Sequence, residues 1–500
     1  MMTAVNVSGQ KQLKKLINAQ FAISQFYVDS VNDDRLVEDA IKGMLNKLDP
    51  HSTYSNATET KELEEPLQGN FSGIGIQFNM KEDTLYVIQT IVGGPSERVG
   101  ILAGDRIVEV NDTAIAGVKM KNSDIMKRLR GPKGTEVRVK VKRHNVPELI
   151  DFRIVRDNIP LFSIDASYMV DNVTGYVRIS RFAEKTHSEF MDAVKSLKKQ
   201  GMKQIIVDLC DNGGGYLQIA TALANEFLAP GQTIVYTEGR NSPRYDATAK
   251  GGGALRDVKA VFLVNQYSAS ASEILSGAIQ DWDRGVIVGR RTFGKGLVQR
   301  PFRFEDGSMI RLTIARYYTP SGRCIQKPYE AGNKKSYDED IYNRYKDGEL
   351  AHADSIHFAD SLRYTTLNTH RTIYGGGGII PDVFVPMDTT KATSFFIKCN
   401  KKATQMRFSS AMFDKYRQQL SSIDSYPELE RFLDNMDIKG KFLRFASDID
   451  GIVPAAGEWE ESAPYLMPQL RALVGRYSKL GDNAFYRMYL EIDDVVKAAM

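Results

Sequence analysis

Cysteine and histidine are scarce in this chain, with three cysteines and six histidines in 500 residues. Cys210, Cys324 and Cys399 lie too far apart along the sequence for a disulfide framework or a structural zinc site. The composition therefore argues against a fold that depends on disulfide bonds or on cysteine-bound metal.

Long apolar runs and an excess of charge of one sign are also missing. No stretch approaches 18 consecutive apolar residues, which argues against a membrane-spanning helix. Lys and Arg total 66 against 62 Asp and Glu, and a net charge of +4 gives no indication of nucleic acid or an anionic membrane as a partner. The start, MMTAVNVSGQKQLKK, lacks the apolar core of a signal peptide.

The composition that remains is that of a soluble globular protein, with 42% apolar and 26% charged residues. At this length we expect about three domains, each large enough to bury a core of its own.

The chain is organised around residues 261–299, where strand and helix patterns alternate. Val261–Val264 is an apolar run typical of a strand, and SASASEIL at 268–275 leads from a short break into a helical pattern. A serine on such a sharp turn would expose its hydroxyl beside the free N–H groups of the helix start. Ser270-x-x-Glu273 also fits a capping box, which is a purely structural alternative.

A lysine lies between two glycines near the end of this stretch. Gly294-Lys295-Gly296 follows a predicted strand and turn, and Leu297–Gln299 is strand-like, so Lys295 and Gln299 should face the same side. Burial disfavours the charged form of a lysine and can make it a base, although most lysines are solvated surface charges. No histidine lies within residues 270–299, so a Ser-His-Asp triad has no obvious base here.

A competing motif occurs at the same place. Gly289-x-x-x-x-Gly294-Lys295 matches the first seven positions of a P-loop, but Gly296 stands where Ser or Thr must hold Mg²⁺. The residues that follow look like a strand and not a helix. The sequence therefore argues against nucleotide binding.

SASASEI followed by TFGKGLVQ resembles the signature of the carboxy-terminal processing (tail-specific) serine proteases, which work with a Ser-Lys pair. The family spacing of twenty-five residues maps the nucleophile onto Ser270 and the base onto Lys295, with Gln299 helping to hold the lysine. Ser268 and Ser272 are then turn or cap residues. The resemblance implies an α/β protease body similar in fold to the crotonase group, and no metal or cofactor.

A triple glycine lies between a buried-type strand at 204–209 and a helix. Glycines in this position bring backbone N–H groups close to a substrate. The family has Asn-Pro-Gly-Gly here as part of its oxyanion hole, and this chain has Gly213 in place of the proline. We therefore assign the oxyanion hole to the N–H of Gly214 or Gly215 together with that of Ala271.

Residues 69 to about 155 resemble a PDZ domain. FSGIGIQF at 71–78 is a glycine loop that leads into an alternating strand, and AGDRIVEVN at 103–111 is PDZ-like. Such a loop can bind a terminal carboxylate through N–H groups while the strand edge pairs with the peptide. The expected peptide-binding residues are Gly73, Ile74, Gly75, Ile76, Ile125 and Leu129. The alternatives are a simple hairpin turn and a module that docks internal segments.

The flanking segments read as helical. We expect a helical segment at 1–68, a PDZ domain at 69–156, a Ser-Lys protease domain at 157–388 and a helical domain at 389–500. The first should pack on the body or on a second subunit, with His51 structural. An insertion at 327–371, rich in tyrosine and charge, is predicted to be a solvated excursion, with an active-site lid as the alternative.

These observations predict an α/β multidomain serine endopeptidase whose PDZ module receives the C-terminal tails of protein substrates. The alternatives are an inactive PDZ adaptor and an acyl-CoA enzyme of the crotonase type. Expected partners are proteins or peptides with accessible C-termini and a second copy of the chain, with no nucleic acid. Bacterial members of the family usually work in the cell envelope, so a periplasmic protein without its leader is expected, with a cytoplasmic one as the alternative.

Overall fold

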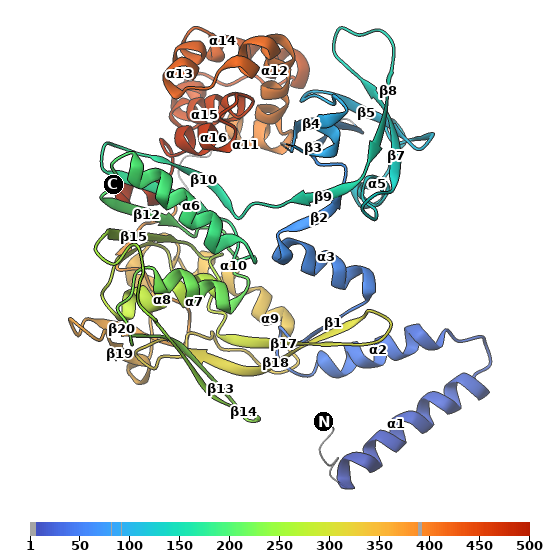
Figure 1. The fold of residues 1–500 in the computed structure, drawn as a ribbon, viewed down its shortest axis with the longest axis vertical. Helices are drawn as coiled ribbons and strands as arrows, with labels where there is room; N and C mark the ends of the chain where they lie inside the picture. Colours follow the sequence, from blue (N-terminus) through green and yellow to red (C-terminus); the bar gives the residue numbers. More distant parts are fainter. Residues whose placement is uncertain (1–6, 82, 92, 389–392) are drawn as a thin grey trace.

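A computed structural model describes residues 7–81, 83–91, 93–388 and 393–500. Residues 1–6, which begin the segment assessed as a signal peptide, lie outside the described residues. Residues 389–392, where the C-terminal helical domain is predicted to begin, also lie outside them. Within them the chain forms an α/β body, an antiparallel PDZ sheet and helical segments at both ends (Figure 1). No helix of this described part combines the length and apolar character needed to cross a bilayer.

The first segment contains the predicted helices and one strand that the sequence analysis missed. Its elements are α1 (Val7–Phe26), α2 (Asp33–Leu45), β1 (Thr53–Ser55) and α3 (Ala57–Gln68). A capping box between Asn56 and Glu59 fixes the start of α3. The all-helical prediction is wrong at β1, because this strand pairs with β18 (Met309–Tyr318), far along the chain.

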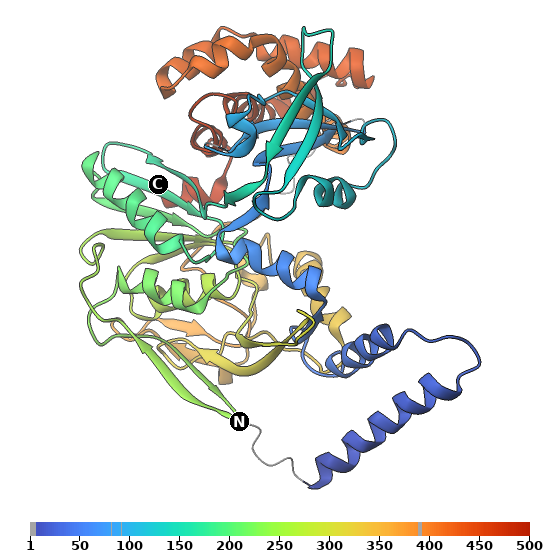
Figure 2. The ribbon, with the colours of Figure 1, turned by 45° about the vertical axis from the view of Figure 1, so that its right-hand side comes forward.

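Helix α1 extends away from the rest of the molecule (Figure 2). Its apolar face is exposed, with Phe21 60% and Phe26 79% accessible. Of the two expected partners for this helix, the body is therefore excluded, and a second subunit is the alternative that the sequence analysis leaves for it.

The PDZ region is a sheet of six strands in the order β3-β4-β5-β7-β8, with β6 paired to β5. Strand β3 is at one edge. A separate pair, β2 with β9, connects this sheet to the body. The elements are β2 (Asn70–Gly73), β3 (Ile76–Lys81), β4 (Thr84–Thr90), α4 (Pro95–Arg98), β5 (Arg106–Val110), β6 (Thr113–Ala114), α5 (Asn122–Leu129), β7 (Glu136–Lys142), β8 (Ile150–Val155) and β9 (Asp157–Pro160).

The α/β body is built on a second sheet of six strands in the order β10-β11-β12-β15-β16-β21. Five of these strands are parallel and β10 is antiparallel to β11. Apolar strands and helices bury one large core between them. The elements are β10 (Ile164–Met169), β11 (Thr174–Ile179), α6 (Thr186–Lys199), β12 (Gln204–Asp208), α7 (Leu217–Asn225), β15 (Lys259–Val264), α8 (Ala271–Asp281), β16 (Val286–Gly289) and β21 (Val383–Phe384).

A five-stranded sheet lies beside this body and carries the lysine segment. Its order is β1-β18-β13-β14, with β17 also paired to β18. The strands are β13 (Thr233–Gly239), β14 (Ser242–Thr248), β17 (Leu297–Arg303) and β18 (Met309–Tyr318). Because β1 joins through β18, the N-terminal segment forms part of the same sheet as the residues that follow Lys295.

The insertion at 327–371 is ordered against the body, so the prediction of a solvated excursion is wrong. Tyr337, Arg344 and Lys327 are buried, because they pack on the loop that precedes and contains Lys295. The insertion and the residues after it contain α9 (Lys334–Asp338), α10 (Asp340–Lys346), η1 (Ala353–Ser355), η2 (Asp360–Leu362), β19 (Arg363–Thr365) and β20 (Thr372–Tyr374).

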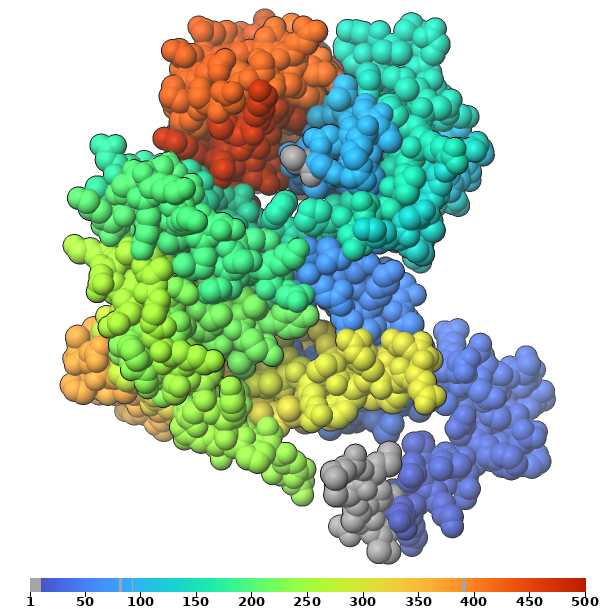
Figure 3. Space-filling model, in the orientation of Figure 1, coloured from blue at the N-terminus to red at the C-terminus, as the bar shows by residue number. Residues whose placement is uncertain are grey.

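The C-terminal helices form a bundle with a separate apolar core. Their bounds are α11 (Ser394–Lys401), α12 (Thr404–Ser422), α13 (Tyr426–Asp434), α14 (Ile438–Asp450), α15 (Glu458–Gly475), α16 (Asp482–Tyr489) and α17 (Asp494–Ala499). The bundle lies beside the PDZ region (Figure 3). It is not a detached tail, because Val495 and Val496 of α17 pack with Tyr176 and Leu263 of the central sheet.

Candidate active site

The serine-rich turn at 265–270 joins β15 to α8 at the carboxyl end of a central parallel strand, where α/β folds place their ligand sites. Ser270 is the residue immediately before α8, and its backbone has φ +58° and ψ −112°. A positive φ is costly for a residue with a side chain and persists only where the surroundings enforce it. The turn therefore presents Ser270 in a strained conformation of the kind found at functional sites.

The three serines of this turn have different environments. Ser268 and Ser272 are completely buried, and their hydroxyls donate to the backbone carbonyls of Leu209 and Asn212 at 2.8 and 2.9 Å. Ser270 is half-buried. The two flanking hydroxyls thus fasten the turn to the neighbouring loop after β12, and Ser270 is the serine that solvent can reach.

Glu273 is the residue whose role the sequence analysis underestimated. Its buried carboxylate accepts hydrogen bonds from the backbone N–H groups of Ser270 (2.8 Å), Gly294 (2.7 Å) and Lys295 (2.9 Å), and from the Thr292 hydroxyl. Burial raises the pKa of this carboxyl, while these hydrogen bonds oppose the rise. The capping-box spacing indicated only the bond to Ser270, because the others come from a segment about twenty residues later.

Lys295 lies in the loop before β17 and is half-buried. Burial lowers the pKa of its ammonium group, and the positive charge of Arg311 lowers it further. In the described residues, its Nζ has no hydrogen-bond or ion-pair partner. The hydroxyl of buried Tyr317 contacts the carbonyls of both Ser270 and Lys295. Tyr317 therefore connects the Ser270 and Lys295 segments through their carbonyl groups, and Glu273 connects them through their N–H groups.

Gln299 is on β17, and its Nε2 donates to Thr313 Oγ1 at 3.3 Å. Thr313 in turn donates to Asp49 Oδ1 at 2.8 Å. No direct bond joins Gln299 to Lys295 within the described residues. Asp49 comes from the N-terminal segment, so the sheet partner of Gln299 is held by a residue that is distant in sequence.

His51 also lies near the lysine. Its Nε2 is 2.9 Å from the Tyr337 hydroxyl, and burial followed by the charge of Lys295 lowers its pKa to about 3. A histidine that remains neutral and bonded to a tyrosine fits the structural role expected for it.

The glycine loop at 213–215 contacts the turn that carries Ser270 directly. A Cβ on Gly214, whose φ is +100°, would lie 2.8 Å from Ser270 Cβ and 2.9 Å from Ala271 N. The N–H of Gly214 is already donated to Asn212 Oδ1 at 2.9 Å. In the part of the chain that the structure describes, the N–H groups of Gly215 and Ala271 have no acceptor. The close contact between this loop and Ser270 therefore requires glycine at position 214, while the N–H groups of Gly215 and Ala271 are available to a ligand.

The insertion holds the other side of the lysine loop. Arg344 of α10 donates to the carbonyls of Thr292 and Phe293 at 2.8 and 3.2 Å. Lys327 Nζ lies 4.1 and 4.0 Å from the ring centroids of Phe293 and Tyr337. These contacts reach the two residues just before Gly294, so the insertion supports the segment that carries Lys295.

The predicted peptide-binding residues of the PDZ region fall together at one end of its core. Gly73 ends β2, Gly75 has φ +74°, and half-buried Ile76 begins β3. Ile74, Ile125 and Leu129 are 0–4% exposed and share one apolar cluster, against which Ile76 packs. The structure thus brings the glycine loop, the edge strand β3 and α5 together.

Glu273→Gln should lower both stability and turnover. One carboxylate oxygen that now accepts hydrogen bonds would be replaced by an amide NH₂ group, which cannot accept them. Each buried donor left unpaired costs about 1–3 kcal/mol. We expect the free energy of unfolding to fall by about 2–4 kcal/mol, and kcat to fall because the Ser270 and Lys295 segments separate. Urea unfolding and single-substrate kinetics measure the two effects. A variant with unchanged kcat would show that these bonds do not position the two residues.

No group of three or more His, Cys, Asp or Glu side chains that could hold a metal occurs in residues 7–81, 83–91, 93–388 and 393–500.

Comparison with known proteins identifies the family of this chain. Residues 173–332 match the model of peptidase family S41, residues 72–154 that of the PDZ domain, and residues 2–60 that of the activating protease CtpB N-terminal domain. A carboxy-terminal-processing protease of Bartonella bacilliformis is 37% identical over 324 residues, covering 63% of this chain and 73% of the relative. The carboxy-terminal processing protease CtpA of Bacillus subtilis is 36% identical over 321 residues, covering 64% and 68%.

Among solved structures, a photosystem II D1 C-terminal processing protease is 26% identical and covers 76% of this chain and 94% of its own, with a TM-score of 0.39. The assignment rests on the sequence relatives, because the matched length includes most of each of them. The chain belongs to the carboxy-terminal processing proteases, a family of S41 serine peptidases, and contains a PDZ domain.

Proposed function

We propose that this protein is a serine endopeptidase that cleaves protein substrates with a Ser270–Lys295 dyad. The observation that carries the proposal is the carboxylate of Glu273, which binds the backbone N–H groups of both residues. Ser270 and Lys295 come from segments that nothing in local structure would bring together. A buried carboxyl group that accepts hydrogen bonds from both segments holds them together.

In the proposed mechanism, Ser270 Oγ attacks the scissile carbonyl and neutral Lys295 Nζ takes the hydroxyl proton. The resulting ammonium group then protonates the leaving amine. Water attacks the acyl-enzyme with Lys295 again as base, and Ser270 is released. Gln299 supports the lysine: its Nε2 is engaged by Thr313, which leaves its carbonyl oxygen to accept from the ammonium.

The oxyanion is stabilised by backbone N–H groups, as in other acyl-transfer enzymes. We propose Ala271 as one donor, because it follows the nucleophile and its N–H is available. Gly215 is the better second donor, because the N–H of Gly214 is occupied by Asn212. Gly214 would serve by allowing the close approach of its loop to Ser270.

The PDZ region is proposed to capture the C-terminal tails of substrates. The N–H groups of Ile74 and Gly75 have no acceptor among the described residues, and β3 offers a sheet edge beside them. A carboxylate bound at this loop would place the peptide along β3. Ile74, Ile125 and Leu129 are already buried, so they would form the floor of a side-chain pocket with Ile76 at its wall. The envelope location common in the family is the expectation for this chain.

A comparison of two peptides tests tail capture. A peptide with an apolar C-terminus should bind the full-length protein at least about tenfold more tightly as the free acid than as the amide, because the amide lacks the charge that the loop N–H groups bind. Fluorescence anisotropy with labelled peptides gives both dissociation constants. Equal affinities would refute carboxylate capture and favour the docking of internal segments.

Protein cleavage separates the proposed function from its alternative. An inactive PDZ adaptor would bind the free-acid peptide and leave unfolded protein substrates intact. The proposed protease should cleave them, and cleavage should be faster for a substrate with a free apolar C-terminus than for the same substrate ending in an amide. Binding without any cleavage by the wild-type chain would establish the adaptor.

A further inference from the structure

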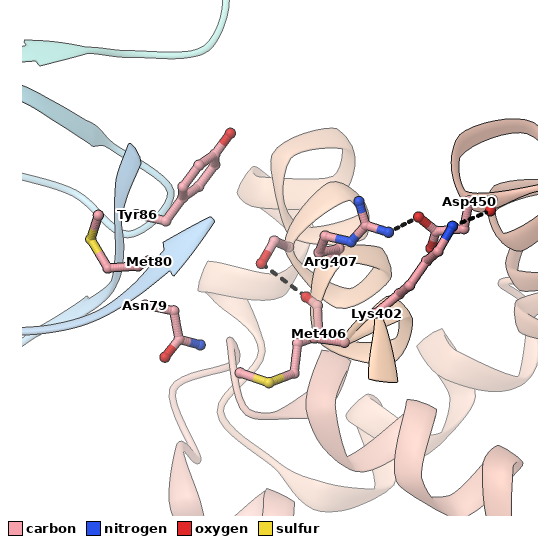
Figure 4. A pocket seen from close by; sticks show the side chains of 9 residues that line it. Asn79, Met80, Tyr86, Lys402, Met406, Arg407 and Asp450 are labelled. Carbon is pink, nitrogen blue, oxygen red and sulfur yellow. Dashed lines mark hydrogen bonds and ion pairs between the residues drawn. The ribbon is translucent and has the colours of Figure 1, made fainter. Parts of the chain in front are cut away.

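A pocket of about 520 Å³ lies between the PDZ sheet and the first long helix of the C-terminal bundle. Figure 4 shows strands β3 and β4 on one side and α12 with its neighbours on the other. The residues that matter for its chemistry are Asn79, Met80, Tyr86, Lys402, Met406 and Asp450. It is separate from the serine and lysine site, and no step of the proposed reaction uses it.

The bundle covers the outer face of the PDZ sheet. Leu85 and Val87 are buried in the PDZ core, so Tyr86 between them points to the opposite face. Asn79 of β3 pairs with Tyr86, and Tyr86 pairs with Arg106, which places these three on the same face. Arg106 forms an ion pair of 2.9 Å with Asp414 of α12. This ion pair holds α12 over the row of residues formed by Asn79, Tyr86 and Arg106.

A peptide bound at the glycine loop would run toward this pocket. Strand β3 is the edge strand, and a carboxylate at its first residues requires the peptide to run antiparallel to it. With one peptide residue paired to each strand residue, the partner of Asn79 lies about three residues before the C-terminus. Directly paired residues project their side chains to the same face. That side chain would therefore point to the outer face, where α12 lies.

The pocket is suited to an acidic side chain with an apolar stem. Met406 is 42% exposed and lines the pocket, so the pocket offers apolar surface. Asp450 binds Arg407 and accepts a hydrogen bond from the Thr404 hydroxyl. Lys402 Nζ instead donates to the backbone carbonyl of Asp450 at 2.7 Å. The Lys402 side chain is exposed, and in the part of the chain that the structure describes its ammonium has no carboxylate partner.

We infer that this pocket is a second recognition site for substrate tails, which takes a Glu or Asp side chain about three residues before the C-terminus. Lys402 binds the carboxylate of that side chain, and Met406 packs on its stem. The C-terminal bundle thereby contributes to substrate selection. This inference rests on the proposed capture of tails along β3.

Four peptides test the inference on the full-length protein carrying Ser270→Ala, which prevents cleavage. They share one apolar C-terminal residue, carry Glu or Lys at the third position before it, and end as free acid or amide. At low salt the Glu peptide should bind about fivefold more tightly than the Lys peptide, because one charge pair is gained and one repulsion is avoided. Adding Lys402→Glu should reverse that preference.

Lys415→Glu is the matched control. Lys415 is exposed on α12, thirteen residues after Lys402, which follows the end of α11, and it does not line the pocket. It changes the net charge equally and should leave the preference for Glu intact. Equal affinities of the Glu and Lys peptides, or a preference that survives Lys402→Glu, would overturn the second site.

The acid and amide pairs separate this inference from tail capture itself. A preference for acid over amide without any preference for Glu over Lys leaves carboxylate capture standing and removes the pocket. A preference for Glu that depends on Lys402, with acid and amide equal, supports the pocket as a peptide site and removes carboxylate capture at the loop.

Discussion

Ser270→Ala should abolish cleavage and covalent labelling by serine-directed acylating reagents. Loss of the nucleophile in a serine peptidase lowers kcat by about 10⁴-fold or more. The fold should be retained, because the backbone of Ser270 already makes the bonds to Glu273 and its side chain is only half-buried. Intact-mass spectrometry after treatment with the reagent measures labelling, and circular dichroism checks the fold.

Ser268→Ala and Ser272→Ala are the controls on the same turn. Each removes a buried hydroxyl that is bonded to a carbonyl of the glycine loop, so each should lower the free energy of unfolding by about 1–3 kcal/mol. Both should still be labelled at Ser270. Labelling that persists in Ser270→Ala, or is lost only in Ser272→Ala, would move the nucleophile to another serine.

Lys295→Arg should be as inactive as Lys295→Ala, with a loss of about 10³-fold or more in kcat. Arginine retains the positive charge and much of the volume, but its guanidinium stays protonated at any practical pH and cannot accept the proton of Ser270. If Lys295 served only as a cation for binding, arginine would preserve a good part of the activity. Substantial turnover by folded Lys295→Arg would overturn the dyad.

The pH dependence of kcat/KM follows from the same role. The neutral form of Lys295 is the active one, so activity should rise with pH through the pKa of the lysine and then level off. Burial places this pKa below the ordinary value of 10.5, and Arg311 lowers it further. Arg311→Met removes a positive charge and should shift the rise to higher pH. A profile that Arg311→Met leaves unchanged would indicate that another group controls the rate.

The sequence by itself determined the local elements and the family. Apolar runs, glycine turns and the spacing of SASAS to FGKG predicted the strand and helix around Ser270, the strand after Lys295 and the PDZ segment. These features depend on residues close in the chain, where periodicity and turn chemistry act directly. The signature also indicated the correct family, which the homologous proteases confirm.

Only the tertiary structure decided which distant segments support the lysine. Asp49 reaches the partner of Gln299 because β1 joins β18, and Arg344 holds the loop before Lys295 because α10 folds back on it. Glu273 reads in sequence as a helix cap, and its bonds to Gly294 and Lys295 exist only once two segments meet. Such contacts follow from chain topology and burial, for which neither periodicity nor spacing carries a signal. The sequence of the Tyr-rich and charged insertion likewise predicted a solvated segment. The prediction is wrong because Lys327 is buried against the rings of Phe293 and Tyr337.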